Sequence, residues 1–213
     1  MPSLKPNLVK RIERLPKPTN TAAALQPLFE AISNSIHSTQ AKFGGHVAQR
    51  VRIVVDIVQD RKKENTSITV DDNGLGLDDD NFEAFETTDT DNKIQIGGKG
   101  VGRLLWLDCF DKIEVTSVFK SGKAFKRRRF DFVLALEDQF KNYKVSASTE
   151  ATASGFYVKF SGLRDNGYRA KFRVEAHTSY NMSSHSFCRL SSVDDARDLA
   201  CMSEAKRASS PMR

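Results

Sequence analysis

The chain has 213 residues, which is enough for one domain with a substantial core or one domain with an appendage, but short for two full domains. Hydrophobic residues make up 39% of it, and no apolar run approaches the roughly 18 residues of a membrane-spanning helix. We therefore expect a soluble protein without membrane contact and, because residues 1–10 do not resemble a signal peptide, a cytoplasmic one. The net charge of +6 permits attraction to polyanions without indicating nucleic acid, and three cysteines without C-x-x-C spacing indicate neither a disulfide framework nor a zinc ribbon.

The N-terminal third of the chain predicts an arm, a long helix and two strands. Apolar residues at helical spacing between 4 and 15 end at the breaker Pro16-Lys17-Pro18, so residues 1–18 are assigned to an N-terminal arm. An amphipathic pattern starting at about residue 21 or 26 and ending near 41 predicts a helix, with Pro27 near its start or at a kink. Two segments rich in β-branched residues, 51–58 and 68–70, predict strands.

The middle of the chain predicts a connection, a second helix and a run of strands. The segment 77–98 is acidic, rich in threonine and poor in large apolar residues after Phe85, so we expect a mobile connection that acts as a lid. A helix is predicted at 101–110. Strands are predicted at 113–119, 124–134, 145–148 and 156–160, the first two as a hairpin. This order predicts an α/β fold, a two-layer sandwich in which a mixed, mostly antiparallel sheet is covered on one face by helices.

The last part of the chain differs in composition from what precedes it. Residues 177–213 are rich in serine and show no sustained periodicity, whereas 19–176 form the predicted main domain. Two explanations remain open: a natural disordered tail, or a truncation or reading-frame change that replaced the natural continuation.

A first candidate motif is EAISNSIH, residues 30–37, on the predicted long helix. Glu30 and Asn34 are four residues apart, so they share one helical face. A carboxylate there can orient a water for attack on phosphorus, and an amide oxygen one turn later can bind Mg²⁺. Taken alone, a solvated polar face is the simpler interpretation.

A second candidate motif is DNGLG, residues 72–76, at the end of a predicted strand. Gly74 and Gly76 allow a sharp turn and close approach to a planar ligand, while Asp72 can accept a hydrogen bond from an exocyclic amine such as that of adenine. An ordinary turn is the alternative.

A third candidate motif is the glycine-rich segment GGKGVG before the predicted second helix, consisting of Gly97, Gly98, Lys99, Gly100, Val101 and Gly102. Backbone N–H groups at a helix N-terminus form an anion site, and Lys99 adds a positive charge for a phosphate. The segment matches neither a Walker A loop nor a Rossmann fingerprint. A glycine-rich hinge is the alternative.

The three motifs in this order resemble the N, G1 and G2 boxes of the GHKL (Bergerat-fold) ATPase superfamily, which includes DNA gyrase, Hsp90, MutL, MORC and histidine kinases. The resemblance covers about residues 20–162. It implies the Bergerat fold, with ATP and Mg²⁺ as cofactors. It also implies Glu30 as general base, Asn34 as Mg²⁺ ligand, Asp72 with Gly74 and Gly76 around the adenine, and the segment 97–102 around the phosphates. Lys93, in a stretch similar to the lid of MutL-like proteins, is a further phosphate candidate.

Two departures from that family bear on function. Histidine kinases usually carry Asn where Glu30 stands, so Glu30 favours an ATPase over phosphotransfer to histidine. Phe156 stands where the family's later Gly-Thr motif has threonine, although Thr152 or Ser154 could supply a hydroxyl. Because the chain is too short for the transducer domain of related hydrolases, we expect ATP binding with slow hydrolysis, in a truncated conformational ATPase that dimerises on binding ATP. A histidine-kinase-type domain and a non-hydrolysing, nucleotide-sensing or DNA-associated module are the alternatives.

A basic run, KRRR at residues 126–129, lies on a predicted strand. We favour a solvated strand edge that resists aggregation over a site for a phosphate backbone.

Overall fold

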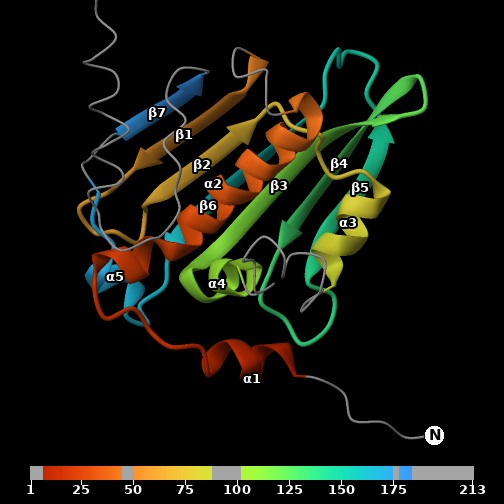
Figure 1. Cartoon of the computed structure of the whole chain (residues 1–213). Helices are drawn as coiled ribbons and strands as arrows, with labels where there is room; N and C mark the ends of the chain where they lie inside the picture. The colour runs from red at the N-terminus through yellow and green to blue at the C-terminus, as the bar shows by residue number, and fades with distance from the viewer. Residues whose placement is uncertain (1–6, 45–49, 88–101, 175–177, 184–213) are drawn as a thin grey trace, which may run out of the picture.

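The computed structural model describes residues 7–44, 50–87, 102–174 and 178–183 (Figure 1). Its helices are α1 (Leu8–Glu13), α2 (Thr21–Phe43), α3 (Asp79–Glu86), α4 (Gly102–Cys109) and α5 (Tyr168–Lys171). Its strands are β1 (Arg52–Val58), β2 (Ser67–Asp72), β3 (Phe110–Ser121), β4 (Ala124–Phe132), β5 (Phe140–Ala147), β6 (Gly155–Leu163) and β7 (Thr178–Ser183). They form one seven-stranded sheet in the order β5-β4-β3-β6-β2-β1-β7.

The sheet is covered on one face by α2, α3 and α4 (Figure 1). Side chains alternate between the two faces, so Ile68 and Val70 of β2 are buried under the helices, as are Ile113 and Val115 of β3. The predicted two-layer α/β sandwich is thus confirmed. Every strand pairing in the described part is antiparallel, so the sheet has no parallel component there.

Helix α2 runs across the sheet and packs against α4 (Figure 1). The Asn20 side chain caps its N-terminus by accepting from the Ala23 N–H at 2.9 Å. Pro27 lies inside the helix rather than at its start. The Trp106 indole of α4 is 1% exposed and donates to the Pro27 carbonyl at 2.9 Å, which fixes α4 against α2. The buried indole therefore makes a specific polar bond as well as filling the core.

Helix α3 lies in the segment that we expected to be a mobile connection. Asp78 caps it by accepting from the Asn81 N–H at 2.9 Å, and Phe82 and Phe85 face the sheet at helical spacing. Their rings pack on Phe130 of β4, with centroids 5.6 Å away in each case. The cap and the two aromatic anchors explain why the acidic segment folds as a helix, so its first half is not the loop we predicted.

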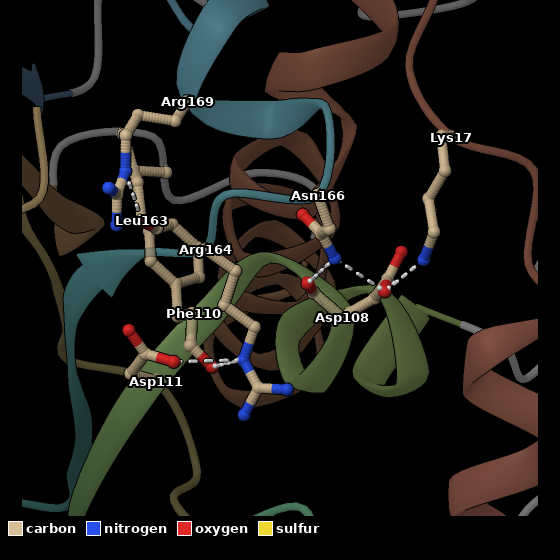
Figure 2. A network of polar contacts seen from close by, with 8 residues as sticks. All are labelled: Lys17, Asp108, Phe110, Asp111, Leu163, Arg164, Asn166 and Arg169. Carbon is tan, nitrogen blue, oxygen red and sulfur yellow. Dashed lines mark hydrogen bonds and ion pairs between the residues drawn. The ribbon is translucent and has the colours of Figure 1, made fainter.

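The C-terminal end of α4 is held by the polar network in Figure 2. Asp108 is 2% exposed and accepts from the Lys17 ammonium at 2.5 Å and from the Asn166 amide at 3.0 Å. The Asn166 amide also donates to the Asp108 carbonyl at 2.8 Å. Arg164 donates to the Phe110 carbonyl at 3.1 Å. The network joins the N-terminal segment, α4 and the loop after β6, so it fixes the position of α4.

The division of the chain into an arm, a main domain and a tail, at residues 18 and 176, stays a prediction. Strand β7 belongs to the segment that we assigned to the tail, and it pairs with β1 of the main domain. Among the described residues, no helix is both long enough and apolar enough to cross a bilayer.

Candidate functional site

The carboxylate of Asp72 ends β2 on the helix-covered face of the sheet. It is 1% exposed, and its Oδ1 accepts from the Gly74 N–H at 2.8 Å. Oδ2 has no hydrogen-bond partner among the described residues, and the same holds for the hydroxyl of Ser35 on α2. The Ser35 hydroxyl lies near enough to stabilise the carboxylate charge, although without hydrogen-bond geometry. A buried acceptor without a donor is costly, so this oxygen is available to a ligand.

Burial is the main influence on the pKa of Asp72, which it raises from 3.8 to about 6. The Ser35 hydroxyl and the Gly74 N–H oppose the shift, the neighbouring Asp71 adds to it, and Arg52 opposes it. Near neutral pH the carboxylate is therefore mostly ionised but held in an unfavourable, desolvated setting. A bound hydrogen-bond donor would relieve that cost.

The turn after β2 is packed so closely that only glycine fits at two positions. A Cβ on Gly74 would collide with the Ser38 side chain of α2. Gly76 has φ +77°, and a Cβ there would collide with the Val118 carbonyl of β3. The Leu75 N–H donates to the Ser38 hydroxyl at 3.0 Å. The glycine spacing noted in the sequence thus reflects close approach of this turn to α2 and to β3.

Lys42 fastens the same turn to α2, although no sequence motif singles it out. Its ammonium donates to the carbonyls of Asn73 at 2.6 Å, Gly74 at 3.1 Å and Ser154 at 3.0 Å. Burial lowers the pKa of Lys42, and the charge of Asp72 opposes that shift. The Ser154 hydroxyl also donates to the Gly74 carbonyl at 2.8 Å, so it is engaged in holding the turn.

The other end of the site lies where α2 meets the start of α4. A Cβ on Gly102, the first residue of α4, would collide with the Glu30 carboxylate, so Glu30 lies directly against the end of the glycine-rich segment. Glu30 and Asn34 are both half-buried on α2. With Ser38 and Lys42 they form a stripe at intervals of four residues, which spans about 18 Å along the helix. That spacing is the one sequence signal for Lys42: it assigns the lysine to this helical face but does not reveal the carbonyls that it binds.

Arg103 connects the start of α4 to the end of α3. Its guanidinium donates to the Ala84 carbonyl at 2.7 Å and the Thr87 carbonyl at 2.9 Å, with its carbon 5.0 Å from the centroid of the Phe85 ring. These bonds satisfy carbonyls at a helix C-terminus. The remaining predicted phosphate residues, Lys93, Gly97, Gly98, Lys99, Gly100 and Val101, lie outside the described residues.

The strand register shows where Phe156, which replaces the family's threonine, lies relative to Asp72. It is the direct partner of Asp72 in the β2–β6 pairing, so the position opposite the carboxylate carries a ring without a donor. The Ser117 hydroxyl, one strand further, is engaged with the Leu77 N–H at 2.7 Å and the Gly155 carbonyl at 3.2 Å. Among the described residues, Ser35 is therefore the hydroxyl that faces Asp72.

Residues 24–154, more than half of the chain, match the family described as histidine kinase-, DNA gyrase B-, and HSP90-like ATPases. The chain belongs to this family. No curated protein matches the chain. The matched region contains both glycine motifs and the whole of the stripe on α2, and family membership agrees with the α/β sandwich described above. The domain is thus an ATP-binding domain of the GHKL type.

Proposed function

We propose that this GHKL-type domain binds ATP with Mg²⁺ and hydrolyses it slowly, as the nucleotide-binding part of a conformational ATPase that dimerises on binding. The observation that carries the proposal is the buried Asp72, whose Oδ2 lacks a donor among the described residues. The stripe on α2 extends from the turn beside Asp72 to Glu30 at the start of α4. The adenine end of a nucleotide would thus meet Asp72, and its phosphate end would meet Glu30.

The adenine end is built from Asp72 and the turn that follows it. The exocyclic amine of adenine would donate to Asp72 Oδ2, which removes the cost of an unpartnered buried acceptor. Gly74 and Gly76 leave no room for a side chain between the turn and its neighbours, so the backbone itself forms the wall. Lys42 keeps that wall in place through its bonds to Asn73 and Gly74.

The phosphate end is built from α2 and the N-terminus of α4. An amide oxygen such as that of Asn34 is a hard ligand suited to Mg²⁺, which typically takes its other ligands from phosphate and water. The described residues contain no cluster of His, Cys, Asp and Glu that could hold a metal by itself, so the phosphates would complete the site. Magnesium bound there would neutralise phosphate charge. Glu30, whose carboxylate lies beside Gly102, would orient a water and take its proton.

Glu30 also separates the proposal from its rivals. A carboxylate beside the phosphate end supports hydrolysis, whereas phosphotransfer to a histidine requires that water is not activated. A nucleotide sensor would bind ATP with the same affinity but would show no turnover that depends on Glu30.

The decisive experiment measures ATP affinity and turnover for the wild type, Asp72→Asn, Asp71→Asn and Glu30→Ala. Asp72→Asn should lose ATP binding. The matched control Asp71→Asn, whose residue points to the other face of β2 and pairs with Arg52, should retain it. Glu30→Ala should bind ATP with Mg²⁺ and lose turnover. Normal ATP binding by Asp72→Asn would refute the site, and turnover unaffected in Glu30→Ala would refute the role of Glu30.

A further inference from the structure

The sheet face opposite the helices carries a group of cations without acidic partners. Side chains alternate along β4, so Arg128, Phe130 and Phe132 are buried under the helices, whereas Arg127 and Arg129 point to the opposite face. Lys120 of β3 and Lys144 of β5 lie on this same face, given the register with β4. We call these residues, Lys120, Arg127, Arg129 and Lys144, the basic face.

The cross-strand register brings like charges together. Arg129 pairs directly with Lys144 on β5, and Arg127 lies two residues further along β4 on the same face. Like charges directly opposite each other destabilise a sheet. No residue of the basic face forms an ion pair within the described part of the chain.

Two carboxylates on the same side of β3 and β4 are already engaged with other groups. Glu114 and Asp131 are direct partners in the β3–β4 pairing, beyond Arg129 along the strands. Glu114 pairs with the Lys112 ammonium at 2.7 Å, and Asp131 accepts from the Asn142 amide at 2.7 Å. Within the described part of the chain, neither carboxylate forms an ion pair with the basic face. The repulsion between Arg129 and Lys144 therefore remains, and an external anion would relieve it.

Hydroxyl groups accompany the guanidinium groups of the basic face. Arg127 pairs with Ser146 of β5, and Arg129 pairs with Thr116 of β3. Hydroxyl, guanidinium and ammonium groups are the donors that contact nucleic-acid phosphates. The donors on this face therefore suit a chain of phosphates.

One aromatic side chain lies among these cations and another lies at their border. Phe125 is opposite Lys120 and half-buried. Tyr157 of β6 is opposite Thr116 and 37% exposed, and its partner on the other side is Asp71 of β2. Cations that hold the backbone and rings on which bases stack are the combination that binds single-stranded nucleic acid. A membrane surface instead requires a continuous apolar face, and only separate rings stand between the charges here. The chemistry of the face thus favours nucleic acid over an anionic membrane.

We propose that the basic face binds the phosphate backbone of nucleic acid without sequence specificity. Charge dominates such binding, so it needs neither a groove nor contacts to base edges. The face lies on the side of the sheet away from Asp72, so it can be occupied together with the nucleotide site. This proposal is independent of ATP binding.

The test is fluorescence anisotropy of the full chain with labelled single-stranded and duplex oligonucleotides across a salt series. The triple variant Arg127→Glu, Arg129→Glu, Lys144→Glu should bind at least about tenfold more weakly at low salt, with a salt slope reduced by about 0.9 for each duplex phosphate that it no longer neutralises. The matched control is Arg61→Glu, Lys62→Glu, Lys171→Glu, which reverses three exposed cations elsewhere and changes the net charge equally. It should retain most of the binding.

Three results would overturn the proposal: no binding by the wild type, equal weakening in the two triple variants, or equally tight binding of polyglutamate or anionic vesicles. Because the triple variant can be impaired in folding, Lys144→Glu is measured alone as well. It replaces the repulsion with Arg129 by an attraction, so it should raise the melting temperature while weakening oligonucleotide binding. A lowered melting temperature would contradict the clustering on which the proposal rests.

Discussion

Replacing Asp72 by asparagine should make the ligand-free protein more stable at neutral pH while removing its affinity for ATP. The side chain is 1% exposed and its Oδ2 has no donor within the described structure. Asparagine has nearly the same shape and keeps an oxygen for the Gly74 N–H, but it carries no charge to desolvate. The substitution therefore isolates the cost of burying the charge.

The magnitude follows from the pKa of Asp72, which burial raises from 3.8 to about 6. The raised pKa means that the folded state holds the proton more tightly than the unfolded state. The wild type therefore loses stability as the pH rises from about 4 to about 6, and the loss amounts to ~3 kcal/mol at 1.36 kcal/mol per pKa unit. Above about pH 6 this loss of stability stays constant. Asp72→Asn lacks this loss entirely.

Urea denaturation of the wild type and Asp72→Asn between pH 4 and pH 8 measures the effect. The variant should gain stability relative to the wild type across this range, by ~3 kcal/mol in total. Asp71→Asn, with an exposed side chain paired to Arg52, is the control that should show no such gain. A difference between wild type and Asp72→Asn that does not change with pH would refute the reasoning.

The same titration has a consequence for ligand binding. If ATP prefers the ionised carboxylate, wild-type ATP affinity should fall by up to about tenfold per pH unit below pH 6. An affinity that stays constant from pH 7 to pH 5 would show that the adenine does not depend on this charge.

Three further substitutions test other contacts. Lys42→Met should lower the free energy of unfolding by about 2 kcal/mol and weaken ATP binding, because the turn after β2 loses a charged donor. Urea denaturation and ATP titration measure the two effects. Lys42→Arg, which keeps the charge, should restore part of the stability and part of the ATP affinity. Arg128→Met should lower the free energy of unfolding by about 2 to 5 kcal/mol, because it leaves the Leu77 and Asp78 carbonyls without their donor. Arg127→Met should change the free energy of unfolding by less than about 0.5 kcal/mol in the same urea assay. Gly102→Ala should displace Glu30 and reduce ATP turnover more than ATP affinity; unchanged turnover would show that Glu30 adapts freely.

Local sequence patterns were sufficient for most of the secondary structure. The apolar face of α2 and the β-branched runs of β1 and β2 are properties of short segments, so their periodicity predicted the elements within a few residues. Helix α3 was missed because its composition is polar apart from Phe82, Ala84 and Phe85. Those rings gain their stabilisation from Phe130, which lies far away in the sequence.

For the site, the motifs predicted the chemistry but not the residues that hold the site in place. Glu30, Asp72 and the glycines stand out because the three motifs occur together in one order, although each motif alone has an ordinary structural explanation. Lys42 does not stand out, because a lysine on a helix is usually solvated, and only the fold brings the Asn73, Gly74 and Ser154 carbonyls to its ammonium. In the same way, KRRR predicts a solvated strand edge, which is wrong because β4 lies inside the sheet between β5 and β3. The pleat buries Arg128, leaves Arg127 half-buried and exposes Arg129.

The sequence by itself therefore determined the fold class and the family, and it predicted the reactive groups, because each depends on residue types at short spacing. The tertiary structure alone decided which polar groups lack partners, which cations face one another and which carboxylate is desolvated. Those properties depend on contacts between segments far apart in the chain: Ser35 comes close to Asp72, and Lys144 to Arg129, only when the sheet and α2 have packed together. Burial and strand register, which no local pattern encodes, set the energies on which the proposed binding depends.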